Sequence, residues 1–181
     1  MDRMDDRACQ LRAHLDSPDG NKVLRLLQII VAAMLLGCLV VGLGFGLFFQ
    51  FHAENQPAPV QENVPQQAER LPVLGIASAV VAVGGLIFGT LMLGQRRQAN
   101  LACLRGEAGM FDPGSILQAS MVAWLAAAAM REGPIFLALL FAMVSDGQDR
   151  TLCLAIALAV FVWWCFHLPT RRKFSVTLGL D

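Results

Sequence analysis

Four long apolar segments constrain the fold of this chain more than any other feature. They cover residues 23–51, 71–94, 116–144 and 152–168, and polar stretches separate them. A helix needs about 20 apolar residues, and at least about 17, to cross the ~30 Å hydrocarbon core of a bilayer. Hydrophobic residues make up 56% of the chain, which is above the usual share for a soluble globular protein. The sequence therefore predicts an all-α polytopic membrane protein with four transmembrane helices in a domain covering residues 23–168.

Positive charges lie mainly on one side of this predicted membrane domain. Of the 14 Lys and Arg residues, eleven lie near the N-terminus, between the second and third segments, or after the fourth. Only Arg70 and Arg150 lie in the two alternate connections. Because connections rich in Lys and Arg stay in the cytoplasm, we expect a multi-pass protein of the inner membrane with both termini cytoplasmic.

The N-terminal segment, residues 1–22, combines many charges with a narrow apolar stripe. Met4, Ala8, Leu11 and Leu15 recur at helical spacing. This pattern predicts a short amphipathic helix on the cytoplasmic membrane surface. An unstructured tail is the alternative.

The cytoplasmic connection before the third segment shows a similar pattern. We expect a second short interfacial helix there, built on Leu101, Leu104, Ala108 and Phe111. Asp112 is expected to be a turn or cap residue, and Ser115 with Gln118 fits a capping box at the start of the third span.

Aromatic and basic residues mark the cytoplasmic end of the fourth segment. Indole rings favour the headgroup region, and clustered basic side chains attract anionic lipid. We therefore expect membrane-interface anchors here, followed by a cytoplasmic tail at residues 169–181: Trp163, Trp164, Arg171, Arg172 and Lys173.

The tetrad Arg131-Glu132-Gly133-Pro134 places two ionisable groups inside the third segment. Glu132 lies roughly 20 Å of helix from the polar residues at either end. Each charge costs about 3 kcal/mol on insertion-based scales, and such residues are functional-site candidates. Pro134 removes the helical partner of the Met130 carbonyl, so we expect a kink with a free carbonyl that could hold water or a cation.

Two interpretations of the tetrad remain open. Without a good counter-charge, desolvation favours the neutral form of a carboxyl, so Glu132 is a candidate proton- or cation-binding group with Arg131 as its electrostatic neighbour. Alternatively, Arg131 and Glu132 form a structural ion pair that fixes helix packing in a non-catalytic assembly protein.

Glycines recur at four-residue spacing in the first two segments. Gly42 and Gly46 form one pair, within a Gly-x-Gly-x-Gly run, and Gly85 and Gly89 form another. Small residues on one face let helix backbones approach closely. Packing within one bundle and packing between copies of the chain would use the same surfaces, so both remain open.

Two short stretches carry a resemblance to a known family. Residues 128–137 (Ala-Ala-Met-Arg-Glu-Gly-Pro-Ile-Phe-Leu) resemble the carboxylate-bearing helix of the proteolipid (c-type) subunits of rotary ATP synthases, and residues 42–46 are similar to the glycine repeat of that family. The resemblance implies that Glu132 matches the proton-binding carboxylate. Arg131, Pro134, the expected cytoplasmic termini and the lack of a second carboxylate depart from the family pattern. We therefore expect a bacterial membrane protein with a proteolipid-like third helix, and not a synthase subunit.

Motifs for other chemistry are not found in the sequence. The five cysteines form no Cys-x-x-Cys pair, and the three histidines lie in three separate regions. We expect no enzymatic activity, no metal, no cofactor and no nucleic-acid partner. The expected partners are the lipid bilayer and either a second copy of the chain or another membrane protein.

Overall fold

The computed structural model describes residues 3–55, 73–107, 111–145 and 147–180. These ranges contain helices and no strand. The helices are α1 (Arg3–Asp16), α2 (Pro18–Asn55), α3 (Val73–Arg105), α4 (Pro113–Val144), α5 (Gly147–Phe166) and α6 (Arg171–Leu178). Four of them, α2 to α5, are long and apolar enough to cross a membrane, which confirms the expected number.

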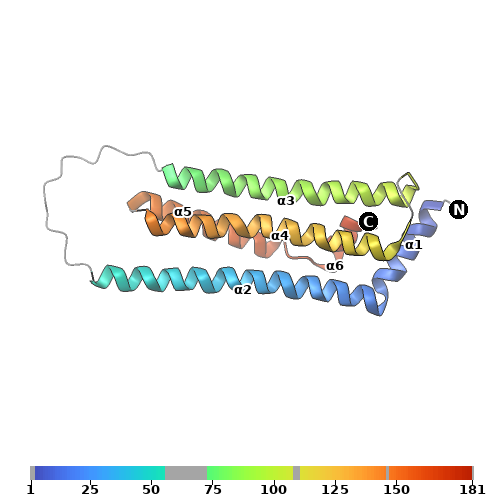
Figure 1. Ribbon diagram of the computed structural model, residues 1–181, viewed down its shortest axis with the longest axis horizontal. Coiled ribbons are helices and arrows are strands. Elements are labelled where there is room, and N and C mark those ends of the chain that lie inside the picture. Colours follow the sequence, from blue (N-terminus) through green and yellow to red (C-terminus); the bar gives the residue numbers. More distant parts are fainter. Residues whose placement is uncertain (1–2, 56–72, 108–110, 146, 181) are drawn as a thin grey trace.

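The four long helices run side by side, with α4 between α2 and the α3–α5 side of the molecule (Figure 1). Within its most apolar window, α4 buries 44% of its residues, against 22%, 17% and 22% for α2, α3 and α5. The outward faces of these three helices carry large apolar side chains, such as Ile29, Val80 and Leu158. A helix that is apolar on its outward face is typical of a protein surrounded by lipid.

The long helices extend beyond the apolar segments from which they were predicted. α2 begins at Pro18 instead of residue 23, and α3 continues to Arg105 instead of ending near residue 94. Hydropathy marks only the apolar part of a helix, whereas backbone hydrogen bonding continues through polar flanks such as Arg96 and Arg97. Leu71 and Pro72, expected in the second span, lie outside the described residues.

The second interfacial helix is a wrong prediction. Leu101 and Leu104 belong to the last turns of α3, which ends where Gly106 adopts a positive φ of 81°. The N–H groups of Gly106 and Glu107 donate to the carbonyls of Cys103 and Ala102, which closes the helix end. Ala108 lies outside the described residues.

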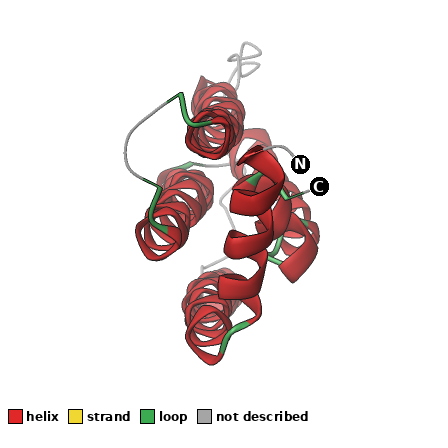
Figure 2. Cartoon of the chain, turned by 90° about the vertical axis from the view of Figure 1, so that its right-hand side faces the viewer, coloured by secondary structure: helices red, strands yellow, loops and turns green. Residues whose placement is uncertain are grey.

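The predicted N-terminal helix is present as α1, but its apolar stripe faces protein. Leu11 is fully buried and Leu15 is 3% exposed, because α1 packs across the end of α2, α3 and α4 (Figure 2). The Arg7 guanidinium donates to the Cys103 carbonyl at 2.8 Å. The stripe therefore closes one end of the bundle.

Asp112 caps the start of α4. Its carboxylate accepts hydrogen bonds from the N–H groups of Gly114 at 3.2 Å and Ser115 at 3.1 Å, and Pro113 occupies the first helical turn. The cap assigned to Asp112 is confirmed. The capping box of Ser115 and Gln118 is wrong, because α4 begins before Ser115 and places that residue inside its first turn.

The C-terminal residues expected to form a tail fold into α6, which lies against α3 and α4. Thr170 caps its first turn, and Gly179 ends it with a φ of 79°. Phe174 and Leu178 are fully buried. The tail is therefore an integral part of the bundle.

A buried polar network holds α6 in place. The Asn100 amide of α3 donates to the Ser120 hydroxyl at 3.0 Å and to the Thr177 carbonyl at 2.9 Å. The Trp124 indole N–H donates to the Thr177 hydroxyl at 3.1 Å. Side chains from α3, α4 and α6 are thereby joined at one level of the bundle.

We expect Asn100→Ala to lower the free energy of unfolding by about 1–3 kcal/mol, because its partners would stay buried without a donor. The measurement is unfolding of the detergent-solubilised chain in mixed micelles with a denaturing detergent. Gln98→Ala is the matched control, since Gln98 is an exposed amide on the same helix. Equal effects of the two substitutions would contradict the role given to Asn100.

The cap of α4 makes a pH-dependent contribution. Hydrogen bonds from the backbone N–H and hydroxyl of Ser115, with a further bond from Gly114, lower the pKa of Asp112 below its usual value of 3.8. A lowered pKa in the folded state stabilises the fold above the unfolded value, and this contribution is lost as the pH falls through the folded value. We expect Asp112→Ala to reduce the melting temperature at pH 7, and the difference from wild type to shrink below about pH 4. Asp112→Asn should keep the cap without this pH dependence. A melting-temperature difference between wild type and Asp112→Ala that stays constant with pH would exclude the mechanism.

Candidate functional site

Arg131 lies on the inner side of α4, facing α3 and α5. Its side chain is 4% exposed, and its guanidinium carbon lies 5.2 Å from the centre of the Trp163 ring. Trp163 in turn stacks on His167, with 3.8 Å between ring centres. The buried Arg131 Nε has no hydrogen-bond partner in the described chain. The cation is therefore held chiefly by an aromatic face, an interaction worth about 2 kcal/mol when desolvated.

Glu132 points toward a different helix. Its half-buried carboxylate faces α2, where the Cys38 thiol lies 3.8 Å from Oε1. No ion pair joins Arg131 to Glu132 among the residues that the structure describes. Consecutive helical residues point about 100° apart, so packing Arg131 between α3 and α5 turns Glu132 away from it.

Pro134 is buried inside α4, and the helix is unbroken through it. The carbonyl of Met130, which Pro134 deprives of its helical partner, lies against Gly85 of α3. A Cβ atom built on Gly85 would come within 2.5 Å of this oxygen and 2.8 Å of the Pro134 ring. The space expected to hold water or a cation at the carbonyl is thus taken by the backbone of α3.

The two glycine pairs have different surroundings. A Cβ on Gly89 would lie 3.2 Å from the Ala127 carbonyl, so both Gly85 and Gly89 lie where α3 and α4 approach closely. Gly42 and Gly46 have no atom of another helix within 4 Å of their Cβ positions. A packing role for Gly42 and Gly46 stays a prediction, and it would need a partner outside the single chain.

A groove of about 230 Å³ opens beside Glu132 between α2, α4 and α5. Its lining is apolar and includes Cys38 and Gly42 of α2, Ile135 and Leu139 of α4, and Ala157 and Phe161 of α5. Ile135 and Leu139 follow Glu132 on the same face of α4, at three and seven residues. Cys38 therefore lies both beside the carboxylate and in the groove.

The expected interface anchors divide into two groups. Trp164 was expected at the membrane interface, but it is 1% exposed and lies inside the bundle. An indole ring suits a protein core as well as an interface. Arg171 and Arg172 are exposed, and Arg171 pairs with Asp16 of α1. Lys173 donates to the Phe166 carbonyl at 2.6 Å and so covers the end of α5.

Among the described residues, no three His, Cys, Asp or Glu side chains gather in a way that could hold a metal ion. Comparison with protein-family models, with curated proteins and with solved structures gives no match for this chain.

We expect Gly85→Ala to destabilise the bundle by about 1–3 kcal/mol, because the added methyl group meets the Met130 carbonyl and the Pro134 ring. Gly84→Ala is the matched control, since nothing lies within 4 Å of its Cβ position. The control should be neutral or slightly stabilising, because Ala favours helix more than Gly. Unfolding in mixed micelles measures both, and a Gly85→Ala variant as stable as Gly84→Ala would contradict the close approach.

Proposed function

We propose that this chain is a multi-pass protein of the inner membrane, with both termini in the cytoplasm, that binds and releases a proton or cation at Glu132. Four helices of sufficient length and apolarity support the membrane location. Both termini lie near the same end of the bundle, together with the connection between α3 and α4 (Figure 1). Most Lys and Arg residues belong to these regions, and this distribution favours a cytoplasmic orientation for that end.

The position of Glu132 along α4 supports a location deep in the bilayer. Exposed apolar side chains on α4 extend from Val122, which is 60% exposed, to Val144, which is 75% exposed. Glu132 lies between them, about 15 Å from the first and about 18 Å from the second. A carboxylate at this depth carries a large desolvation cost in its charged form.

The single observation that carries the proposal is the separation of Glu132 from Arg131. A carboxylate paired with a buried guanidinium would stay ionised and inert. Among the described residues, its hydrogen-bond partner is the Cys38 thiol, which is a weak donor. The acid is therefore neutral while lipid surrounds it, and it ionises when water or a cation arrives along the α2 side.

Arg131 has a different role in this proposal. Its burial against Trp163 fixes α5 to α4 and leaves a positive charge within the same turn of α4 as the carboxyl group. The resemblance of residues 128–137 to the proteolipid helix is compatible with this role for Glu132 and remains a prediction.

A second candidate is a packing or assembly protein without transport. The observation that favours it is the glycine face of α2, where no described atom of another helix lies within 4 Å of the Cβ positions of Gly42 and Gly46. A second copy or another membrane protein could cover this face. In this candidate the pairing of Glu132 involves the partner, since the Arg131–Glu132 pair is not formed within the single chain.

The test uses the full-length chain in liposomes, with carbodiimide labelling of Glu132 and proton flux as readouts. We expect labelling to fall as the pH rises, because carbodiimides react with the protonated acid. Glu132→Gln should abolish labelling and reduce flux to the level of empty liposomes. Glu107→Gln is the matched control, since Glu107 is an exposed carboxylate on the connection between α3 and α4.

The outcomes separate the two candidates. Flux that is the same in Glu132→Gln and wild-type liposomes, with the fold intact, would overturn proton handling. Loss of a defined oligomer in Glu132→Gln, with no flux in any variant, would favour the assembly protein.

A further inference from the structure

A second cavity lies between α1 and the C-terminal helix α6. It has a volume of about 450 Å³, and its lining shares no residue with the groove beside Glu132. Its polar lining consists of Arg12 and Asp16 from α1 and Arg171, Arg172 and Ser175 from α6. Leu15 and Leu180 form its apolar part. We call this cavity the α1–α6 pocket.

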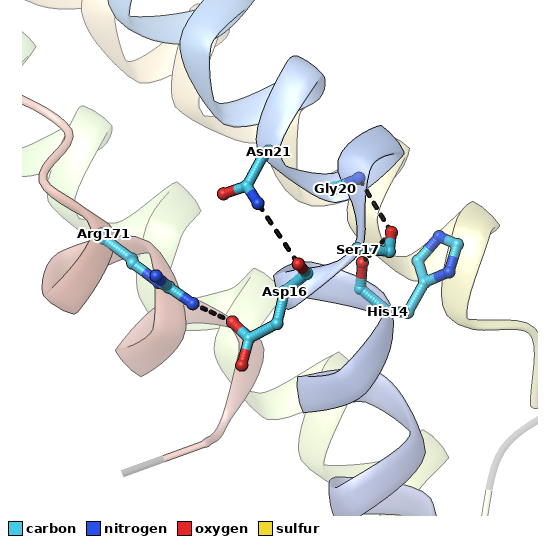
Figure 3. Close-up of polar contacts among 6 residues, drawn as sticks. All are labelled: His14, Asp16, Ser17, Gly20, Asn21 and Arg171. Atoms are coloured by element: carbon cyan, nitrogen blue, oxygen red, sulfur yellow. Dashed lines mark hydrogen bonds and ion pairs between the residues drawn. The ribbon is translucent and has the colours of Figure 1, made fainter.

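The described lining of the α1–α6 pocket carries an excess of positive charge. Three guanidinium groups and one carboxylate line it within the described residues. Asp16 forms an ion pair with Arg171 (Figure 3), and the Arg12 guanidinium donates a hydrogen bond to the Leu180 carbonyl at 2.9 Å. The Arg172 side chain is exposed and makes no hydrogen bond or ion pair with the rest of the described chain. One carboxylate therefore balances one of three cations.

The helix geometry adds to this excess. Arg171 and Arg172 occupy the first turn of α6, which holds no acidic residue. Cations are unfavourable there, because the N-terminal end of a helix carries a partial positive charge of its own. An anion in the pocket would be stabilised by the guanidinium groups and by the helix end together.

We propose that the α1–α6 pocket binds a phosphate group, carried either by the headgroup of an anionic phospholipid or by free phosphate. Guanidinium groups bind phosphate oxygens with paired hydrogen bonds, and Arg12 and Arg172 approach the pocket from its two walls. The Ser175 hydroxyl, which now donates to the Arg172 carbonyl at 2.8 Å, is a further donor on the same wall. Bound phosphate would tie α1 to α6, so it would join the two ends of the chain. This site is independent of the function proposed for Glu132.

The test uses the full-length chain in detergent, with short-chain phosphatidylglycerol and inorganic phosphate as separate probes. Phosphatidylcholine of the same chain length is the zwitterionic comparison. We expect saturable binding of at least one phosphate probe, and roughly tenfold weaker binding by Arg172→Gln, because a charge-assisted hydrogen bond is lost. The double variant Arg12→Gln/Arg172→Gln should weaken binding further, and added salt should weaken binding by the wild type.

Arg105→Gln is the matched control, since Arg105 is an exposed arginine at the end of α3 and does not line the pocket. Because the Arg172 side chain has no partner among the described residues, its variant should keep the wild-type melting temperature.

The two probes identify the source of the phosphate. Saturable phosphatidylglycerol binding that inorganic phosphate does not displace supports a lipid headgroup, and displacement by inorganic phosphate supports a free anion. Either result supports phosphate binding in the pocket only if Arg172→Gln weakens binding of the probe and Arg105→Gln does not. Equal binding by wild type and both pocket variants, or the lack of saturable binding by either probe, would overturn the proposal.

Discussion

The close approach of α3 to α4 is the contact on which the arrangement of the buried charges depends. Gly85 and Gly89 bring the two backbones together at the level where Pro134 frees the Met130 carbonyl. This contact covers the carbonyl and sets the rotation of α4 about its axis. Arg131 is then enclosed on the side of α3 and α5, and Glu132 turns toward α2 because it is the next residue along the helix. One packing constraint thereby separates two charges that are adjacent in the sequence.

The bundle is joined by polar contacts at one end and is loosely packed around the carboxylate. Near the termini, Asn100, Ser120, Trp124 and Thr177 connect three helices through buried hydrogen bonds. Around Glu132, the groove between α2 and α5 is apolar and open. Among the four long helices, α2 packs least against the other three.

Sequence patterns predicted the features that depend on long stretches of the chain. Four apolar segments of at least 17 residues predict four long helices, because only a helix satisfies every backbone group in an apolar environment. The cap at Asp112 was also predictable, since its carboxylate acts on N–H groups two and three residues away.

Features that depend on tertiary contacts were not predictable in this way. The Gly-x-x-x-Gly spacing is the same at Gly42 and at Gly85, yet only at Gly85 does another helix approach within 4 Å of the Cβ position, because the motif permits close approach without specifying a partner. Nothing in an eight-residue segment that begins with three basic residues predicts a docked helix such as α6, whose position depends on Asn100, far away in the sequence. The side chain of Trp164 would suit either lipid headgroups or a core, and only the neighbouring helices place it in the core.

The short length of α5 has a consequence for the whole C-terminal region. α5 has 20 residues, whereas α2, α3 and α4 have 38, 33 and 32, so the three longer helices continue past its end at Phe166. α6 fills the vacant position beside them and covers Leu104 with Phe174 and Leu178, all fully buried. If α6 were pulled away, an apolar surface at that end of the molecule would be exposed. α6 thus covers an apolar surface that the short length of α5 would leave open.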